Sequence, residues 1–462
     1  MKVLENNFKL NFKNNSFNFY NASDGIIPFI ISEILQNKKK IVIALSDNKY
    51  LKPFAKTLSA ITGINNILIF PSWDCFPYSD VSPSNYNINI RFKVLTEILF
   101  QKNDYKIIIT NFKNLTMLLP NKGEVISNIF YLEKNKEYNL KDTINTLSSR
   151  GYNHVNLVLE PNEYAIRGGI IDIWPVGEQA PVRLDFFGDT LESIKLFDPM
   201  SQISKKEKHS ISILQNIEPP LSDTAKNDFI SNYRNYFGPS SNKDLFIHQL
   251  KEDKKLDGIE HWMPLFYKKK FISFFDFFNP EYLIFEHNLL NELEIFYKET
   301  IDAYSEKKEL ASTQIESINQ PIKPELLYLD QNLLSKQLNL IKKIEFNKFI
   351  SKKSNNYDLK ATDNIEKDIK VNSDEQLFRI LQSIVLKRTK KKIIFVADNE
   401  KNKEKLIFYI KNLFKNEEFI LRTNKSNFTE CFDDQEIVDI FIYPLDKGCL
   451  LYTSPSPRDR IS

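Results

Sequence analysis

The sequence predicts an α/β protein: a parallel-sheet module, interrupted by an inserted small antiparallel α+β domain and followed by a second small α/β domain. Two observations support this prediction. Short, continuous apolar runs alternate with helical patterns early in the chain, as expected for parallel strands that helices cover on both faces. Five of the 11 glycines lie between Gly151 and Gly188, where turn signals separate short strands.

Residues 1–128 are expected to form the first half of the parallel-sheet module. Apolar residues at helical spacing predict helices over 26–35 and 50–61. Continuous apolar runs predict strands at 40–45, 67–70 and 106–110.

Residues 129–215 show a different period and predict the inserted α+β domain. A helix over 140–150 is followed by alternating strand patterns at 152–159, 168–176, 182–187 and 191–197. Turns are expected at 177–179 and 188–189, where glycine permits a positive φ.

The rest of the chain is expected to complete the first module and to add a smaller one. Residues 216–348 are mainly helical in pattern, with an aromatic-rich segment at 271–286 that includes a strand at 282–285. A polar linker is expected at 349–372 and a small α/β domain at 373–448, with helices over 375–387 and 401–414 and strands at 393–396 and 437–442. The last residues, 449–462, resemble translated sequencing adapter, so we exclude them and expect the natural protein to continue beyond Gly448.

Composition excludes several functional classes. No two glycines lie five apart, so a GxxxxGK[ST] phosphate loop cannot be written, and none lie two apart, which excludes GxGxxG. The 63 basic and 60 acidic residues give a net charge of only +3, too little for a strongly basic nucleic-acid-binding protein. The three cysteines form no CxxC, and there is no signal peptide or long apolar run. We therefore expect a cytoplasmic location and no membrane contact.

The expected strand 182–187 carries an unusual set of side chains. Alternation places Val182, Leu184 and Phe186 on one face, and Arg183, Asp185 and Phe187 on the other. Arginine and aromatic residues on a rigid sheet are typical of protein-protein hot spots. Alternatively, Phe187 packs under a neighbouring helix and Arg183 pairs with Asp185 or Asp172. Asp185 has no His, Cys or second acid at a spacing useful for catalysis.

Three other segments carry possible chemistry. Aromatic residues within 70–91 could stack on bases beside Arg91 and Lys93, or pack against the sheet. The expected strand 282–285 is followed by Glu286 but lacks the preceding acid that holds magnesium in nucleotide-hydrolysing motors. The basic run 387–392 could contact phosphates or RNA polymerase, or could be a solvated helix end. The five histidines show no zinc-binding spacing.

The segment NEYAIRGGIIDIWPVGEQAPVRLDFFGDTLESIKLFDPMSQIS, residues 162–204, resembles the UvrB-homologous region of the bacterial transcription-repair coupling factor (Mfd) family. Further similar segments occur in the family's order, and the resemblance covers about residues 20–448. These segments are FPSWDCFPYSDVSPS near residue 70, GIEHWMPLFY at 258–267 and FFDFFNPEYLIFEHN at 274–288.

The resemblance implies an architecture. The first module would be a degenerate RecA-like module similar to domain 1 of UvrB, with the α+β domain inserted between its halves. Where UvrB has a phosphate loop, this chain has NASDGIIP at 21–28, so the fragment itself would bind no cofactor. The family's RNA-polymerase-binding domain, its ATP- and Mg-dependent DNA translocase and its C-terminal regulatory domain would lie beyond this chain. The alternative is a UvrB-like DNA-dependent ATPase or helicase subunit of excision repair.

The resemblance also implies a partner and contact residues. In the family, the inserted domain recruits UvrA through two arginines and a phenylalanine, which correspond here to Arg167, Arg183 and Phe187. Hairpin residues expected to support them are Gly168, Gly169, Asp185 and Gly188. The implied function is UvrA recruitment in transcription-coupled nucleotide-excision repair in the bacterial cytoplasm, with RNA polymerase and duplex DNA bound by the absent domains. Without the regulatory domain, which covers this surface in the family, the chain is expected to present the surface constitutively.

Overall fold

The computed structural model describes most of the chain up to residue 347 and parts of the remainder. The described ranges are 16–20, 27–35, 40–100, 105–238, 245–252, 256–286, 288–312 and 319–347, followed by 356–358, 362–363, 379, 393–397, 400–413, 420–422, 437–442 and 450–451. The expected helix over 375–387 and the basic run 387–392 lie almost entirely outside the described residues.

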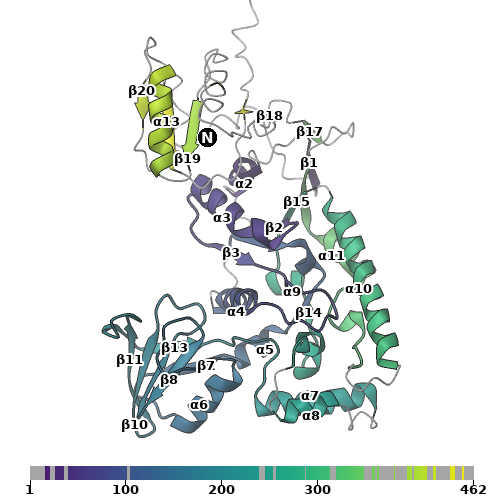
Figure 1. Ribbon diagram of the computed structural model, residues 1–462. Coiled ribbons are helices and arrows are strands. Elements are labelled where there is room, and N and C mark those ends of the chain that lie inside the picture. Colours follow the sequence, from purple (N-terminus) through teal and green to yellow (C-terminus); the bar gives the residue numbers. More distant parts are fainter. Residues whose placement is uncertain are drawn as a thin grey trace, which may run out of the picture.

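A seven-stranded sheet forms the centre of the main module (Figure 1), and every strand pair in it is parallel. The strand order is β17-β1-β16-β15-β2-β4-β3. Their bounds are β1 Ser16–Tyr20, β2 Ile41–Leu45, β3 Ile67–Phe70, β4 Ile107–Asn111, β15 Tyr282–Glu286, β16 Lys342–Phe346 and β17 Asn356–Asp358. Strands that precede and strands that follow the inserted residues therefore build one sheet.

Each face of this sheet is covered by its own apolar core. Alternate residues of β2, Ile41 and Ile43 on one side and Val42 and Ala44 on the other, belong to two separate clusters. Helices α2 (Ile27–Leu35) and α3 (Asn48–Thr62) pack on the first side, and α4 (Asn85–Phe100) on the second. Burial on both faces explains why these strands are continuous apolar runs in the sequence.

Short elements connect this sheet to the inserted unit. They are the helical turn η1 (Phe112–Leu115), strand β5 (Leu118–Leu119), which pairs with β14 (Ile272–Ser273), and helix α5 (Lys122–Ser127).

The expected strands at 40–45, 67–70 and 106–110 are confirmed to within one residue at each end, as β2, β3 and β4.

The inserted unit contains a six-stranded sheet of order β12-β11-β10-β9-β8-β7 and helix α6 (Leu140–Ser149). Its strands are β7 Asn153–His154, β8 Glu163–Arg167, β9 Ile170–Ile173, β10 Val182–Phe187, β11 Thr190–Phe197 and β12 Ser204–Lys208. Strands β6 (Phe130–Glu133) and β13 (Ser210–Ile213) pair beside it, antiparallel to each other. In Figure 1 this unit lies at the lower left, near α4 and α5.

The inserted unit differs from the sequence prediction in several details. Strand β8 was not predicted, and the strand expected over 168–176 is shortened to β9. The strand expected over 152–159 is reduced to β7, and β7 pairs parallel to β8, so the sheet is not entirely antiparallel. The prediction failed because Val158 is buried against Ala165 and Phe197 from a loop and makes the segment look like a strand. A polar segment instead forms β12, the charged edge of the sheet.

Residues after the insertion are mainly helical, as predicted for 216–348. They form α7 (Asp223–Phe237), α8 (Leu245–Lys251), η3 (Ile259–Phe266), α9 (Phe274–Phe278), α10 (Leu289–Ser312), η4 (Pro324–Leu326) and α11 (Gln331–Leu340). Helix α10 runs along the right side of the molecule in Figure 1.

The C-terminal part contains a small three-stranded parallel sheet of order β19-β21-β20 with helix α13 (Glu400–Leu413) against it. Its strands are β19 Ile393–Ala397, β20 Ile420–Arg422 and β21 Ile437–Ile442. Within the segment expected to be a linker, β17 extends the main sheet and β18 (Thr362–Asp363) pairs with β22 (Leu450–Leu451), which lies in the segment that we had excluded.

Candidate protein-interaction surface

Two tight hairpins form one end of the inserted sheet. Gly168 and Gly169 join β8 to β9, and Gly188 and Asp189 join β10 to β11. Gly168 and Gly188 have φ values of 62° and 59°, while the second turn residues do not have positive φ, as type II′ hairpin turns require. Glycine at these two positions therefore sets where the flanking residues stand.

Gly169 is needed for a different reason, because the two hairpins touch. A Cβ atom at this position would lie 2.5 Å from the carbonyl oxygen of Phe186, and the Phe186 amide donates a hydrogen bond of 2.9 Å to the carbonyl of Gly169. The absence of a side chain lets the backbones of β9 and β10 approach each other at the tip.

All three predicted contact residues share one face of this sheet. In β10, Val182, Leu184 and Phe186 are buried in the core, while Arg183, Asp185 and Phe187 alternate with them, as predicted. Arg167 faces the same side because it pairs with Ile170, which in turn pairs with Asp185, and direct cross-strand partners point to one face. The sheet thus brings together side chains from two hairpins.

Phe187 is the prominent apolar side chain of the hairpin tip. This residue is 77% exposed, so the alternative in which it packs under a helix is wrong. Arg167, beside the other turn, is also exposed, and its Nη2 donates to the carbonyl of Asn156 at 3.3 Å. An exposed phenyl ring on a rigid hairpin is a ready contact for another protein.

Arg183 is held in place by the chain itself. Its Nε and Nη2 donate to the two carboxylate oxygens of Asp172 at 2.7 and 2.8 Å, and Asp172 is 2% exposed. The guanidinium also lies over the Phe197 ring, 4.8 Å from its centroid. These hydrogen bonds to Asp172 raise the pKa of Arg183 above its usual value.

This pairing confirms the alternative in which Arg183 pairs with Asp172. Asp172, on the neighbouring strand, takes the bidentate edge of the guanidinium, so Arg183 cannot use that edge to grip a carboxylate of another protein. What Arg183 offers a partner is its remaining exposed surface; its side chain is 23% exposed. In the sequence, the signal for this ion pair is an aspartate, Asp172, within the otherwise apolar run IIDI.

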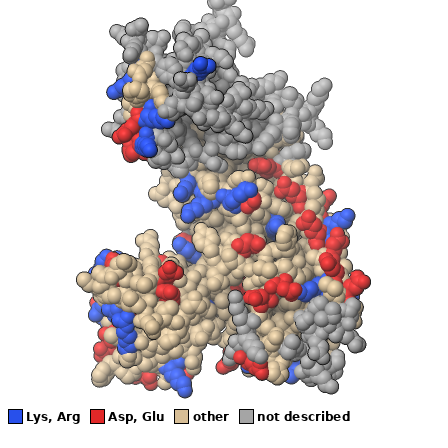
Figure 2. Space-filling model, in the orientation of Figure 1, with Lys and Arg blue, Asp and Glu red and all other residues tan. Residues whose placement is uncertain are grey.

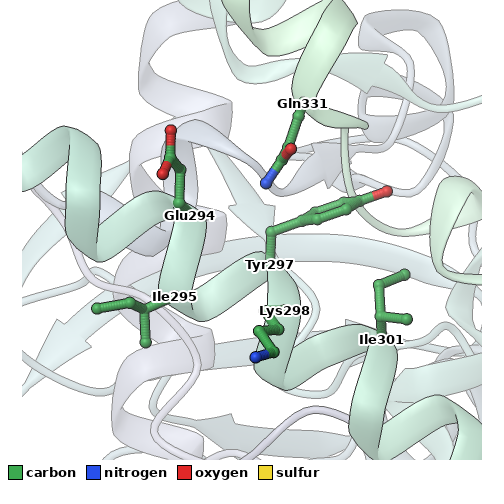
Figure 3. A pocket seen from close by; sticks show the side chains of 6 residues that line it. All are labelled: Glu294, Ile295, Tyr297, Lys298, Ile301 and Gln331. Atoms are coloured by element: carbon green, nitrogen blue, oxygen red, sulfur yellow. The ribbon is translucent and has the colours of Figure 1, made fainter.

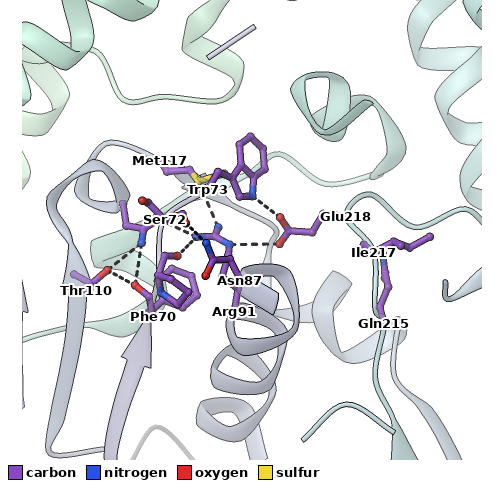
Figure 4. A network of polar contacts seen from close by, with 12 residues as sticks. Phe70, Ser72, Trp73, Asn87, Arg91, Thr110, Met117, Gln215, Ile217 and Glu218 are labelled. Carbon is purple, nitrogen blue, oxygen red and sulfur yellow. Dashed lines mark hydrogen bonds and ion pairs between the residues drawn. The ribbon is translucent and has the colours of Figure 1, made fainter. Parts of the chain in front are cut away.

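The segment 70–91 is a packing element with an unexpected buried charge. Trp73 and Tyr78 are buried, whereas Phe76 and Tyr86 are exposed, and Arg91, expected to supply positive charge nearby, is 0% exposed. Arg91 donates to the carbonyl of Pro71 and to the Asn114 side chain, and forms an ion pair with Glu218 (Figure 4). The packing alternative is therefore confirmed for Trp73 and Tyr78, and Arg91 is buried and cannot supply positive charge to a nucleic acid.

In the described residues, no group of three or more His, Cys, Asp or Glu side chains is placed to hold a metal ion. A shallow depression of about 490 Å³ lies between α10 and α11, lined by Glu294, Ile295, Tyr297, Lys298, Ile301 and Gln331 (Figure 3). On the face drawn in Figure 2, basic and acidic side chains of the described residues are interspersed rather than gathered in one basic surface. Within the part of the chain that the structure describes, no helix is long and apolar enough to cross a bilayer.

Comparison with known proteins places the chain in a family context. The model of the UvrB interaction domain matches residues 130–218, from β6 to the Glu218 that pairs with Arg91. The transcription-repair-coupling factor of Haemophilus influenzae is 28% identical over 330 residues, 71% of this chain and 28% of that protein. The chain is a relative of the transcription-repair-coupling factors.

Two further relatives agree with this assignment. The transcription-repair-coupling factor of Escherichia coli is 29% identical over 47% of this chain and 19% of its own length. That of Borreliella burgdorferi is 33% identical over 40% of this chain and 16% of its own length. The family resemblance read from the sequence is thereby confirmed, and the chain spans less than a third of each of these three proteins.

Proposed function

We propose that this chain acts in transcription-coupled nucleotide-excision repair by recruiting UvrA, without catalysing a reaction itself. The contact surface is the face of the inserted sheet that carries Arg167, Arg183 and Phe187. The observation that carries the proposal is the 77% exposure of Phe187 at a hairpin tip whose geometry is fixed by glycine, within the segment that matches the UvrB interaction domain.

The three residues have different roles in this proposal. Phe187 supplies apolar area that loses water on binding, and Arg167 supplies a charge whose hydrogen-bonding capacity is largely unused by the chain. Arg183 supplies a positively charged group in a fixed position on the same face of the sheet. It is preorganised because Asp172 and Phe197 hold it before the partner arrives.

The main sheet is proposed to be a degenerate RecA-like module that supports the inserted sheet. Its parallel strands and two-sided core are compatible with that ancestry, and the glycine spacing excludes a phosphate loop. ATP, magnesium, RNA polymerase, duplex DNA and the regulatory domain would be bound or supplied by parts of the protein outside this chain, in the bacterial cytoplasm.

The experiment is a titration of UvrA against the purified chain and its single variants. Phe187→Ala and Arg167→Ala are expected to weaken binding by tenfold or more, since truncating a hot-spot side chain costs about 2 kcal/mol. Arg183→Ala is expected to weaken it too, but this variant also leaves Asp172 unpaired, so its fold must be checked by unfolding. Unchanged affinity for Phe187→Ala and Arg167→Ala contradicts the assigned surface.

DNA-stimulated ATP hydrolysis by the same purified chain is the second measurement. The proposal predicts none above background. Hydrolysis that depends on duplex or single-stranded DNA would instead indicate a UvrB-like enzyme.

A further inference from the structure

A second set of exposed apolar side chains lies next to Arg183. The loop 198–203, between β11 and β12, carries Met200 and Ile203, which are 87% and 65% exposed. Phe187, the proposed anchor, is exposed to a similar degree. Large apolar groups that stand this far into water contribute nothing to the core of the free protein.

The loop is held in one shape by its own polar groups. Asp198 Oδ1 accepts hydrogen bonds from the backbone amides of Met200 and Ser201, and its Oδ2 accepts one from Lys205 Nζ at 2.8 Å. These bonds, the one from Lys205 first, hold the pKa of Asp198 well below its usual range. Met200 therefore lies on a turn whose backbone is fixed by hydrogen bonds.

Gln202 closes the same turn. Its φ of 60° is in the left-handed region, its amide donates to the carbonyl of Asp198 at 2.7 Å, and its Nε2 donates to the carbonyl of Pro199 at 2.7 Å. The amide of Asp198 in turn donates to the carbonyl of Ile203 at 3.0 Å. A shape fixed in advance lowers the entropy cost that a partner meets on binding.

Gln202 also connects the loop to the proposed surface. Arg183 Nη1 lies 3.4 Å from the carbonyl oxygen of Gln202, and Arg183 Nη2 lies 3.4 Å from its side-chain oxygen. The ring of Phe197, the last residue of β11, lies under the same guanidinium. The loop thus bends toward the face of the sheet that carries Arg183 and lies next to that face.

We propose that Met200 and Ile203 form a second apolar contact for UvrA, so that the binding surface runs from Phe187 across Arg183 to the loop 198–203. This inference rests on the proposed function. It commits to a partner surface that has two apolar recesses, with a polar strip between them for the exposed edge of Arg183. Asp172 occupies the bidentate edge of the Arg183 guanidinium, so this edge cannot bind a carboxylate of the partner. In this proposal the affinity comes instead from the apolar area of Phe187 and of the loop 198–203.

The test measures the affinity of UvrA for the full chain carrying Met200→Ala and Ile203→Ala together. We expect a loss of tenfold or more with an unchanged unfolding midpoint, because both side chains are exposed. Leu340→Ala, at the end of α11, is the matched control, since Leu340 is 82% exposed and lies outside the inserted sheet; it is expected to bind as the unmodified chain does.

The outcomes separate this inference from the proposed function. If Phe187→Ala weakens binding and the Met200 and Ile203 double variant does not, the second contact is wrong and the proposed function stands. If the unmodified chain does not bind UvrA, both are overturned. A second variant, Met200→Asp, places a charge in the proposed recess and is expected to weaken binding further than Met200→Ala; equal affinity of Met200→Asp and the unmodified chain contradicts the contact.

Discussion

Two arginine-carboxylate pairs, one in each of the two main regions, show how the same chemistry is used for different purposes. In the main module, Arg91 is paired with Glu218 at 3.6 Å and the side chains of both are at most 1% exposed. In the inserted sheet, Arg183 is paired with Asp172 at 2.7 Å, and Arg183 reaches solvent while Asp172 does not. The first pair is fully buried and is called the sealed pair below. In the second, the half-open pair, the guanidinium is partly exposed to solvent.

The surroundings of the two pairs explain the difference. Glu218 also accepts a hydrogen bond of 2.6 Å from Trp73 Nε1, and the Arg91 guanidinium lies 4.5 Å from the centroid of the Phe70 ring (Figure 4). Glu218 follows the inserted unit in sequence, so this network ties the returning chain to α4 of the main module. Burial lowers the pKa of Arg91, whereas hydrogen bonds to Asp172 raise that of Arg183. The buried pair joins two units, and in the proposed function the partly exposed pair positions Arg183 for a partner.

The largest effect is expected from breaking the sealed pair. Arg91→Met leaves the Glu218 carboxylate buried without its cation, and loss of one partner from a buried pair costs about 3–5 kcal/mol. Urea unfolding of the variant should show this loss in the free energy of unfolding. The double variant Arg91→Met/Glu218→Gln should recover part of it, and a double variant less stable than Arg91→Met would contradict the sealed-pair interpretation.

A pH-dependent effect is expected at Glu260, a buried acid near Glu218. Glu260 is 4% exposed and accepts a hydrogen bond from Ser82 rather than from a guanidinium. Burial raises its pKa from 4.5 to about 7. Because the folded-state pKa is raised, the stability contributed by the protonated acid is fully present below about pH 4.5 and is lost as the pH rises through 7.

Glu260→Gln removes this loss and should stabilise the protein by up to about 3 kcal/mol at pH 8, with little gain near pH 4.5. Neighbouring His261 has the opposite dependence: burial lowers its pKa to about 4, so its contribution is lost as the pH falls. Urea midpoints of the two proteins, compared from pH 5 to 8, isolate Glu260 because His261 is common to both. A difference that does not grow with pH would refute the assignment.

A smaller loss is expected from breaking the half-open pair. Arg183→Ala leaves the buried Asp172 carboxylate without its bidentate partner, which should cost about 1–3 kcal/mol of stability. Thermal or urea unfolding measures it, and Arg183→Ala combined with Asp172→Ala should cost less than the sum of the two single changes. If Arg183→Ala proves as costly as Arg91→Met, the two pairs are not distinguished as proposed.

The smallest effect on stability is expected at Phe187. Phe187→Ala should change the free energy of unfolding by no more than about 0.5 kcal/mol, because the ring is exposed and packs on little. Urea unfolding gives this value directly. A loss of 2 kcal/mol would mean that the ring supports the hairpin and is not free for a partner.

How far the sequence could predict the structure depends on the range of the interactions. Strand β10 and its two faces follow from alternation within six residues, and β2, β3 and β4 follow from local apolar runs. Strands β1 and β16 were missed, because short segments such as KKIEF gain their strand character from a parallel pairing with residues far away in the chain. Local pattern carries no information on such a pairing.

The same limit applies to the candidate surface. Phe187 and Arg183 were placed on one face by alternation, and the turns by their glycines. The pairing of Arg91 with Glu218 was not predicted, since nothing in the pattern around Arg91 distinguishes a buried arginine from an exposed one. The position of the loop 198–203 beside Arg183 was not predicted either, because it depends on the positive φ of Gln202 and on contacts between its backbone and Arg183.

The most direct test of the central claim compares two phenylalanines that are equally exposed. Phe187 and Phe76 are both 77% exposed, but Phe76 lies in the loop after β3 of the main module. UvrA affinity should fall tenfold or more for Phe187→Ala and remain unchanged for Phe76→Ala. Equal affinities for the two variants would contradict the claim that the hairpin face of the inserted sheet is the recruitment surface.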